Sequence, residues 1–220
     1  MNNPTVHTTR SSAASIETNK VLRNTYTLLA MTLAFSAAVA GISMAMGLPH
    51  PGLIITLVGF YGLLFLVHKT ANSSAGLLSV FALTGFMGYT LGPMLNYAIG
   101  SGGIEIVMMA LGGTALIFFS LSAYVLTTKK DMSFLGGMMV AGFVVIVVGF
   151  IANLFLKMPA LGLALSALFI LFSAGAILMQ TSAIIKGGER NYILATVTLF
   201  VSLYNIFVSL LNILMAFGRE

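Results

Sequence analysis

The sequence predicts an all-α integral membrane protein built as one bundle of seven transmembrane helices. Composition is the first observation: 59% of residues are hydrophobic, 7% are charged and the mean hydropathy is +1.05, which excludes a water-soluble globule. The second is that the ten basic and five acidic residues lie at the ends of seven apolar runs or between them. The 220 residues leave no room for a second folded domain.

Each predicted span meets the requirement for about 20 apolar residues to cross about 30 Å of hydrocarbon, except for a shorter second span. Pro49 and Pro51 oppose a backward extension of that span. Polar residues in the seventh span leave a re-entrant ending open, and we expect a full crossing. The seven spans are predicted at 24–46, 52–67, 77–99, 106–126, 135–156, 161–185 and 192–217.

Basic residues alternate between the two sides of the predicted bundle. A cytoplasmic N-terminus places eight on the cytoplasmic side and two, Lys157 and Arg219, on the other. The positive-inside rule therefore predicts a cytoplasmic N-terminus and an extracytoplasmic C-terminus. The eight are Arg10, Lys20, Arg23, Lys69, Lys129, Lys130, Lys186 and Arg190.

Residues 1–19 are rich in Ser, Thr and Asn and carry too little apolar surface to fold alone, so we expect a flexible cytoplasmic tail before a transmembrane domain at 20–220. A cleaved signal peptide is the alternative, since Lys20 and Arg23 precede an apolar run containing Ala38-Val39-Ala40. That run starts late and continues through Met46, which favours an uncleaved first span.

Polar residues form stripes on the last two spans. They recur at steps of four, three, four and three in the seventh span, and at steps of seven in the sixth. A short connection, 186–191, makes these spans antiparallel neighbours whose polar faces can meet. The stripes comprise Thr198, Ser202, Asn205, Ser209 and Asn212 in the seventh span, and Ser166, Ser173 and Gln180 in the sixth.

Two interpretations of these stripes remain open. Hydroxyls and amides bridge neighbouring transmembrane helices, each bond contributing roughly 0.6 to 2 kcal/mol. The other interpretation is a hydrated path, but a cation path normally carries an acid and these spans have none. Packing is the favoured interpretation.

Gly88 and Gly92 form a Gly-x-x-x-Gly pair directly before Pro93 in the third span. Small residues at this spacing favour close helix packing, with a local bend at the proline. The alternative is a helix broken at Gly92-Pro93 that exposes backbone groups to a cavity.

Enzyme chemistry finds little support in the sequence. Cysteine is absent, and His7, His50 and His68 lie in predicted tails or loops without zinc-binding or nucleophile motifs. We therefore expect no catalysis, metal or cofactor. The basic residues flank apolar runs, so they indicate membrane topology rather than nucleic-acid binding. Glu105 and Asp131 lie where each can stabilise a helix N-terminus.

Four motifs resemble the Bax inhibitor-1 family over nearly the whole chain. The most specific is the predicted cytoplasmic loop at 127–137, Thr-Thr-Lys-Lys-Asp-Met-Ser-Phe-Leu-Gly-Gly, which contains Lys129, Lys130 and Asp131. The others are Arg-Asn-Thr-Tyr at 23–26, Gly-Gly-Thr-Ala at 112–115 and Tyr-Asn-Ile-Phe at 204–207. The resemblance implies a seven-helix bundle with a cytoplasmic N-terminus, in the bacterial inner membrane.

The resemblance further implies a function through a protein partner. A bacterial member of this family is regarded as a modulator of the membrane-bound AAA+ protease FtsH, acting with HflK and HflC. We hypothesise that FtsH engages residues 1–19 and then pulls on a bundle that resists extraction, so that the enzyme is occupied.

The alternative implied function is a pH-sensitive calcium leak channel, attributed in other members to an aspartate pair on the sixth and seventh helices. The corresponding positions here are Gln180 and Ser202, which carry no charge. Calcium prefers several hard oxygen ligands with carboxylate charge among them. Contact between Gln180 and Ser202 is implied by resemblance only, since hairpin arithmetic places Gln180 nearer the level of Thr196.

Overall fold

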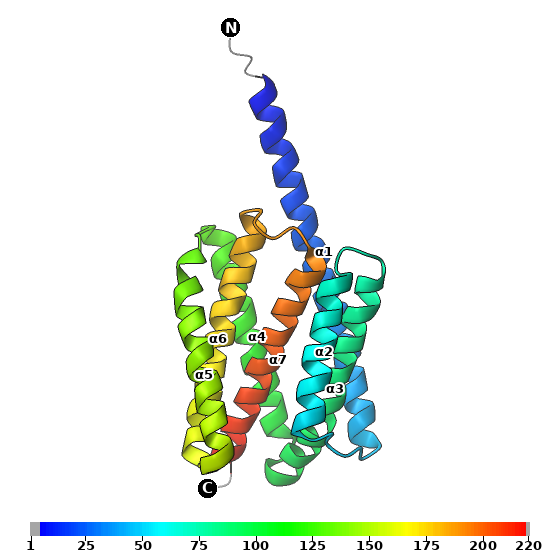
Figure 1. The fold of residues 1–220 in the computed structure, drawn as a ribbon, viewed down its shortest axis with the longest axis vertical. Helices are drawn as coiled ribbons and strands as arrows, with labels where there is room; N and C mark the ends of the chain where they lie inside the picture. The colour runs from blue at the N-terminus through cyan, green and yellow to red at the C-terminus, as the bar shows by residue number, and fades with distance from the viewer. Residues whose placement is uncertain (1–4, 219–220) are drawn as a thin grey trace.

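A computed structural model describes the backbone of residues 5–218 and the side chains of residues 16–218. The described chain folds into seven α-helices that run side by side (Figure 1). A 3-10 turn, η1, precedes α5. The elements are α1 (Thr5–Ala45), α2 (Leu53–Thr70), α3 (Ala75–Gly102), α4 (Ile104–Thr128), η1 (Ser133–Leu135), α5 (Gly136–Leu156), α6 (Pro159–Ile185) and α7 (Tyr192–Phe217).

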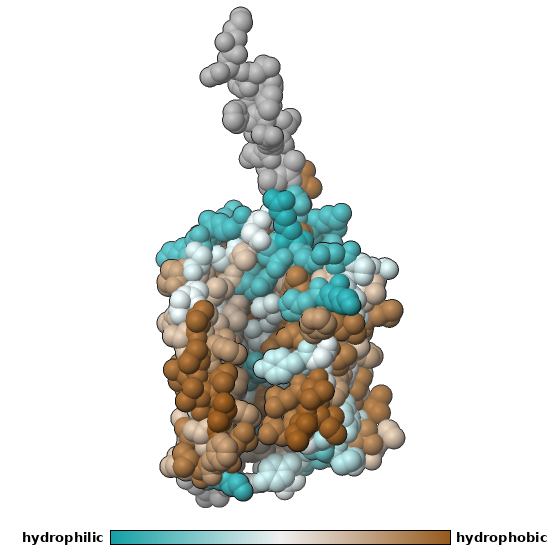
Figure 2. Space-filling model, in the orientation of Figure 1, coloured by the Kyte–Doolittle hydropathy of each residue, from teal (hydrophilic) through white to brown (hydrophobic). Residues whose placement is uncertain are grey.

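All seven α-helices are long and apolar enough to cross a membrane, which confirms the predicted class. On the face in Figure 2, a brown apolar band lies beneath a teal polar end. Most helices extend a few residues beyond the predicted spans. Between α3 and α4 a single residue, Gly103 at φ 82°, separates the two helices. Helix α7 is unbroken over 26 residues, so the re-entrant ending is not observed.

Helix α1 starts at Thr5, where composition predicts a flexible tail. Figure 1 shows its N-terminal part projecting beyond the other helices. No Gly or Pro occurs between residues 5 and 40, so no residue in this stretch interrupts the backbone hydrogen bonding of the helix. The mobility of the segment stays a prediction, and residues 1–4 lie outside the described part. We call the end from which α1 projects the tail-side end.

Helix α7 forms the centre of the bundle. In the most apolar stretch of each helix, 61% of the residues are buried in α7, against 6% in α2. Helix α7 packs against α1, α2, α3, α4 and α6, and α5 lies outside against α6. Its buried side chains include Leu199, Phe200 and Ile206, which meet Leu28 of α1 and Leu83 of α3 in one apolar cluster. The last span of the sequence is therefore the core of the fold.

Candidate functional site

The polar stripe of α7 lies inside the bundle, but its hydroxyls do not bridge helices. Thr198 Oγ1 donates to the carbonyl of Leu194 at 3.1 Å, and Ser202 Oγ donates to the carbonyl of Thr198 at 2.8 Å. Each bond stays within one helix. Ser202 and Ser209 are buried, whereas Asn205 and Asn212 are half-buried. On α6, Ser166 likewise donates to its own helix, at the carbonyl of Gly162.

Other polar residues make the bridges between helices. The single hydroxyl hydrogen of Thr196 in α7 is shared between the carbonyl of Tyr192 in its own helix, at 2.7 Å, and the carbonyl of Thr25 in α1, at 3.2 Å. Thr90 of α3 and Tyr204 of α7 share a hydrogen bond of 2.8 Å between their hydroxyls. The stripe residues themselves do not form these bridges, so the packing interpretation of the two stripes stays a prediction. Sequence spacing misses the bridging residues because they lie off the regular stripes and their partners are remote in the sequence.

The two family positions, Gln180 and Ser202, are not hydrogen-bonded to each other. Ser202 donates to its own helix, and the side-chain nitrogen of Gln180 is buried with no partner. The neighbouring Thr181 is fully buried, and its hydroxyl also has no partner. Among the described residues, no group of three or more His, Cys, Asp and Glu side chains is placed to hold a metal ion. The site therefore presents neutral amide and hydroxyl groups.

Several further buried polar atoms lack partners near the same region. Tyr26, whose ring centroid lies 5.9 Å from that of Phe118, has a buried hydroxyl without a partner, as do Ser122 and Ser173. These residues come from α1, α4 and α6, each of which packs against α7. Leaving a buried hydroxyl unpaired costs about 1 to 3 kcal/mol, and such groups in proteins commonly bind water.

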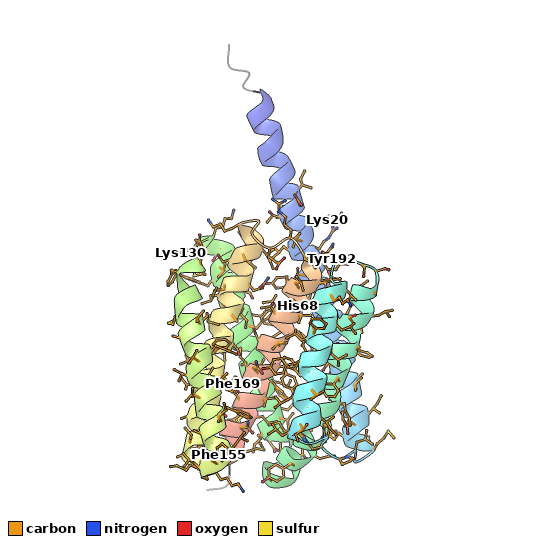
Figure 3. The ribbon with its side chains drawn as sticks, viewed as in Figure 1. Lys20, His68, Lys130, Phe155, Phe169 and Tyr192 are labelled. Carbon is orange, nitrogen blue, oxygen red and sulfur yellow. The ribbon has the colours of Figure 1, made fainter. Side chains whose placement is uncertain are left out.

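The loop between α4 and α5 is held tightly against α6. Ser182 Oγ donates to the carbonyl of Lys130 at 3.2 Å and accepts from the backbone N–H of Met132 at 3.0 Å, and Met132 is buried. Lys129 ends α4 in the left-handed conformation, at φ 52°. The loop therefore has one defined shape at the tail-side end, where Figure 3 also places Lys130, Lys20 and Tyr192.

Asp131 stabilises the start of η1 within this loop. Its Oδ1 accepts from the backbone N–H of Ser133 at 2.9 Å. The hydrogen bonds from Ser133 and the nearby charge of Lys186 hold the pKa of Asp131 below its usual range. The exposed Lys129 and Lys130 leave the surface of this loop basic.

Helix α3 is continuous through Gly88, Gly92 and Pro93, so the alternative of a broken helix is wrong. A Cβ added at Gly88 would collide with the backbone carbonyl of Ser36 in α1, and one at Gly92 with the side chain of Ser43. Proline has no N–H, so the carbonyl of Tyr89 loses its helical partner. Ser43 replaces that partner by donating to Tyr89 at 3.0 Å.

A polar pocket of about 500 Å³ opens at the tail-side end. It lies between the loop that joins α2 to α3 and the loop that joins α6 to α7. Asn191 connects the two loops by donating to the carbonyl of Ala71 at 3.0 Å and to the side chain of Asn72 at 2.8 Å. The same side chain caps α7 by accepting from the N–H groups of Ile193 and Leu194. Arg190 lines the pocket and is exposed.

These features define a multi-pass α-helical membrane protein whose interior contains neutral polar groups. Residues 18–219 match the family described as "Inhibitor of apoptosis-promoting Bax1", and the chain belongs to this family. The resemblance found in the motifs is thereby confirmed.

Several bacterial relatives are similar along almost their whole length. The chain is 62% identical over 205 residues to "Modulator of FtsH protease YccA" of Escherichia coli (strain K12), covering 93% of this chain and 94% of that one. It has the same identity and coverage with "Inner membrane protein YccA" of Escherichia coli O6:H1. An "Uncharacterized membrane protein" of Vibrio cholerae is 44% identical, covering 94% of this chain and 93% of the other.

Proposed function

We propose that this protein is an inner-membrane interaction protein that modulates the protease FtsH. The observation that carries the proposal is the identity of 62% over 93% of the chain with a protein named as an FtsH modulator. The neutral interior supports a role through a partner rather than through ion transport, since intramembrane pathways for ions generally use ionisable groups. The action is non-enzymatic, and HflK and HflC are further proposed partners.

The tail-side end is the proposed cytoplasmic end. Basic residues with described side chains concentrate there, on α1, on the ends of α2 and α4, and on the loop between α6 and α7. Lys157 follows α5 at the opposite end. The positive-inside rule therefore supports a cytoplasmic N-terminus, and with seven crossings an extracytoplasmic C-terminus.

The proposed mechanism is occupation of the protease by a substrate that it extracts slowly. The start of α1, which projects beyond the other helices, supplies a handle (Figure 1). Pulling α1 into water separates it from α3, α6 and α7, against which it packs. Because α7 is the most buried helix, loss of α1 exposes the centre of the core. A slowly extracted bundle keeps the protease from other substrates.

Deletion of residues 2–19 tests the handle. In cells with FtsH, the deletion should lengthen the half-life of the protein several-fold, while replacement of the same residues by a Gly-Ser segment of equal length should leave it short. Comparing the two variants shows whether FtsH requires only a segment of sufficient length at the N-terminus or the particular sequence of residues 2–19. FtsH should be crosslinked to the intact protein in native membranes, and absence of that crosslink would refute the proposal.

Calcium flux in liposomes that contain the pure protein separates this proposal from the leak channel. The neutral pair Gln180 and Ser202 leads us to expect negligible flux from the unaltered chain. The double substitution Gln180→Asp and Ser202→Asp restores the family's acids and tests whether flux then appears. Flux from the unaltered protein would favour the channel instead.

A further inference from the structure

Helices α1 and α4 both pack against α7 but stay apart from each other. In the described chain, no Cα atom of α1 lies within 8 Å of a Cα atom of α4. The space between them is a groove of about 620 Å³, with α3 and α7 forming its floor. We call it the α1–α4 groove.

The surface of the α1–α4 groove is apolar. Ala34 and Ala37 form one wall, Leu111 and Ala115 the other, and Leu203 and Phe207 lie on the floor. Among the hydroxyls in the lining, Thr114 donates to its own helix and Tyr204 pairs with Thr90, whereas the buried hydroxyl of Tyr26 has no partner. An occupant therefore meets mainly hydrocarbon, which favours an apolar chain over a polar ligand.

The groove opens sideways, toward the membrane. Ala34, Ala37, Leu111 and Ala115 are exposed although they lie within the membrane-spanning parts of α1 and α4. Lipid acyl chains therefore surround the opening, and no aqueous route is needed to reach it.

One end of the groove is basic. The groove-lining face of α1 includes Tyr26, Ala30 and Ala34. Toward the N-terminus, Arg23 lies one turn beyond Tyr26 at the edge of this face, about 60° around the helix, and Lys20 lies about 120° around. Both side chains are long enough to reach toward the end of the groove. Both basic side chains are exposed, and so is the acidic Glu17 one turn beyond Lys20, which leaves a net positive charge of one on this stretch of α1.

The charges along α4 are arranged in the same direction. Helix α4 ends at the basic Lys129 on the tail side and begins beside the acidic Glu105 at the opposite end. An anionic group is therefore favoured at the tail-side end of the groove and disfavoured at the other.

The volume suits one acyl chain. At about 30 Å³ for each water-sized group, 620 Å³ holds roughly twenty such groups, close to the methylenes of one long fatty-acyl chain. A transmembrane helix is about 10 Å across and about 30 Å long, so it encloses roughly four times the volume of the groove.

We propose that the α1–α4 groove binds one acyl chain of an anionic glycerophospholipid, whose phosphate is held by Lys20 and Arg23. The chain fills the space between two helices that do not touch, and the phosphate fixes its position along the groove. This site is independent of the proposed action on FtsH.

Substitution of the groove wall tests the acyl-chain site. Native mass spectrometry of the full chain in detergent, with added phosphatidylglycerol, measures the retained lipid. Ala34→Phe places a ring in the groove and should weaken retention about tenfold, the loss expected from displacing about two methylenes. Ala38→Phe is the matched control, because Ala38 is exposed on the same helix and does not line the groove. Equal retention by the two variants would overturn the proposal.

A milder substitution protects the test against misfolding. Ala37→Leu adds less bulk to the same wall and should reduce retention in a variant whose melting temperature stays close to that of the unaltered protein. Retention that is unchanged in this folded variant and in Ala34→Phe would count against the site.

Charge substitutions test the headgroup. The double variant Lys20→Gln and Arg23→Gln should lose the preference for phosphatidylglycerol over phosphatidylethanolamine. The control, Lys69→Gln with Lys157→Gln, changes net charge equally at residues away from the groove and should keep the preference. An equal loss in both variants would indicate diffuse charge attraction and contradict the assigned phosphate site.

A photo-crosslinking side chain at position 37 identifies the occupant directly in native membranes. A product heavier by one phospholipid supports the proposal. A product joined to a second copy of the chain or to another protein, with no lipid adduct, would overturn it.

Discussion

Ser43 and Pro93 form a matched pair across α1 and α3. Proline removes the helical partner of the Tyr89 carbonyl, and Ser43 supplies another at 3.0 Å. The serine lies fifty residues earlier in the chain, so the pairing has no local sequence signal. A proline within a transmembrane helix can thus remain compatible with packing when a neighbouring helix satisfies the freed carbonyl.

We predict that Ser43→Ala lowers the free energy of unfolding by about 1 to 3 kcal/mol, because the half-buried carbonyl of Tyr89 is left unpaired. Pro93→Ala in the same background should recover most of that loss, since residue 93 then offers its own N–H to Tyr89. The four proteins of this double-mutant cycle can be compared by unfolding in detergent. Additive effects of the two substitutions would contradict the pairing.

Asp131 makes a pH-dependent contribution to stability. Its pKa in the folded protein is lowered by the hydrogen bonds from Ser133, so its contribution is fully present above the unfolded pKa of 3.8. It is lost as the pH falls through the lower, folded pKa. The melting temperature of Asp131→Asn should therefore fall below that of the unaltered protein at pH 7, and the gap should narrow at pH 3. A gap that is equal at both pH values would refute this role.

At the scale of helices, the contact between α1 and α3 depends on glycine. Gly88 sits against the backbone of Ser36, which cannot turn away as a side chain could. A collision with backbone has to be relieved by moving one helix relative to the other. The Gly-x-x-x-Gly pair thus sets how closely α1 approaches α3.

We predict that Gly88→Ala destabilises the bundle by about 1 to 3 kcal/mol through overpacking. Gly62→Ala is the control: Gly62 lies inside α2, and an added Cβ would meet no atom within 4 Å. That change should stabilise the protein by about 0.5 to 1 kcal/mol, because alanine loses less backbone entropy in a helix. Thermal unfolding of both variants measures the contrast, and equal effects would contradict the packing argument.

At the scale of the whole molecule, the proposed action on FtsH couples function to stability. A protease that pulls from the N-terminal end must separate α1 from α3, α6 and α7. The resistance of these contacts then sets how long the enzyme is occupied. Packing far from any site of contact with FtsH thereby affects the proposed modulation.

We predict that purified FtsH degrades Gly88→Ala faster than the unaltered protein, and Gly62→Ala at the same rate or more slowly. Both variants keep the tail, so the rates report extraction rather than engagement. Degradation is followed by loss of the full-length band over time. If the degradation rates of the three proteins do not follow the order of their stabilities, slow extraction is not the means of modulation.

The sequence alone predicts the class, the seven helices and the neutral character of positions 180 and 202. Helix existence is predictable in a membrane because each segment must be apolar along its length and must satisfy its backbone internally. The ends of the helices are less predictable. Helix α3 continues to Gly102 because the backbone leaves the helical conformation only at Gly103, which adopts a positive φ. Among the candidate site residues, the sequence identifies polar stripes but not the hydroxyls that bridge helices, such as Thr196 and Thr90.

The sequence by itself therefore determined that this is a multi-pass helical membrane protein of the Bax inhibitor-1 family, because hydropathy and motifs are local properties of the chain. Only the tertiary structure decided that α7 is central, that Ser43 satisfies Tyr89, and that α1 and α4 stand apart with a groove between them. These features depend on the side-chain volumes and hydrogen-bonding groups of segments that are remote in the sequence. In lipid, the pairing of such segments is determined by packing and hydrogen bonding, because excluding water does not drive one helix against another.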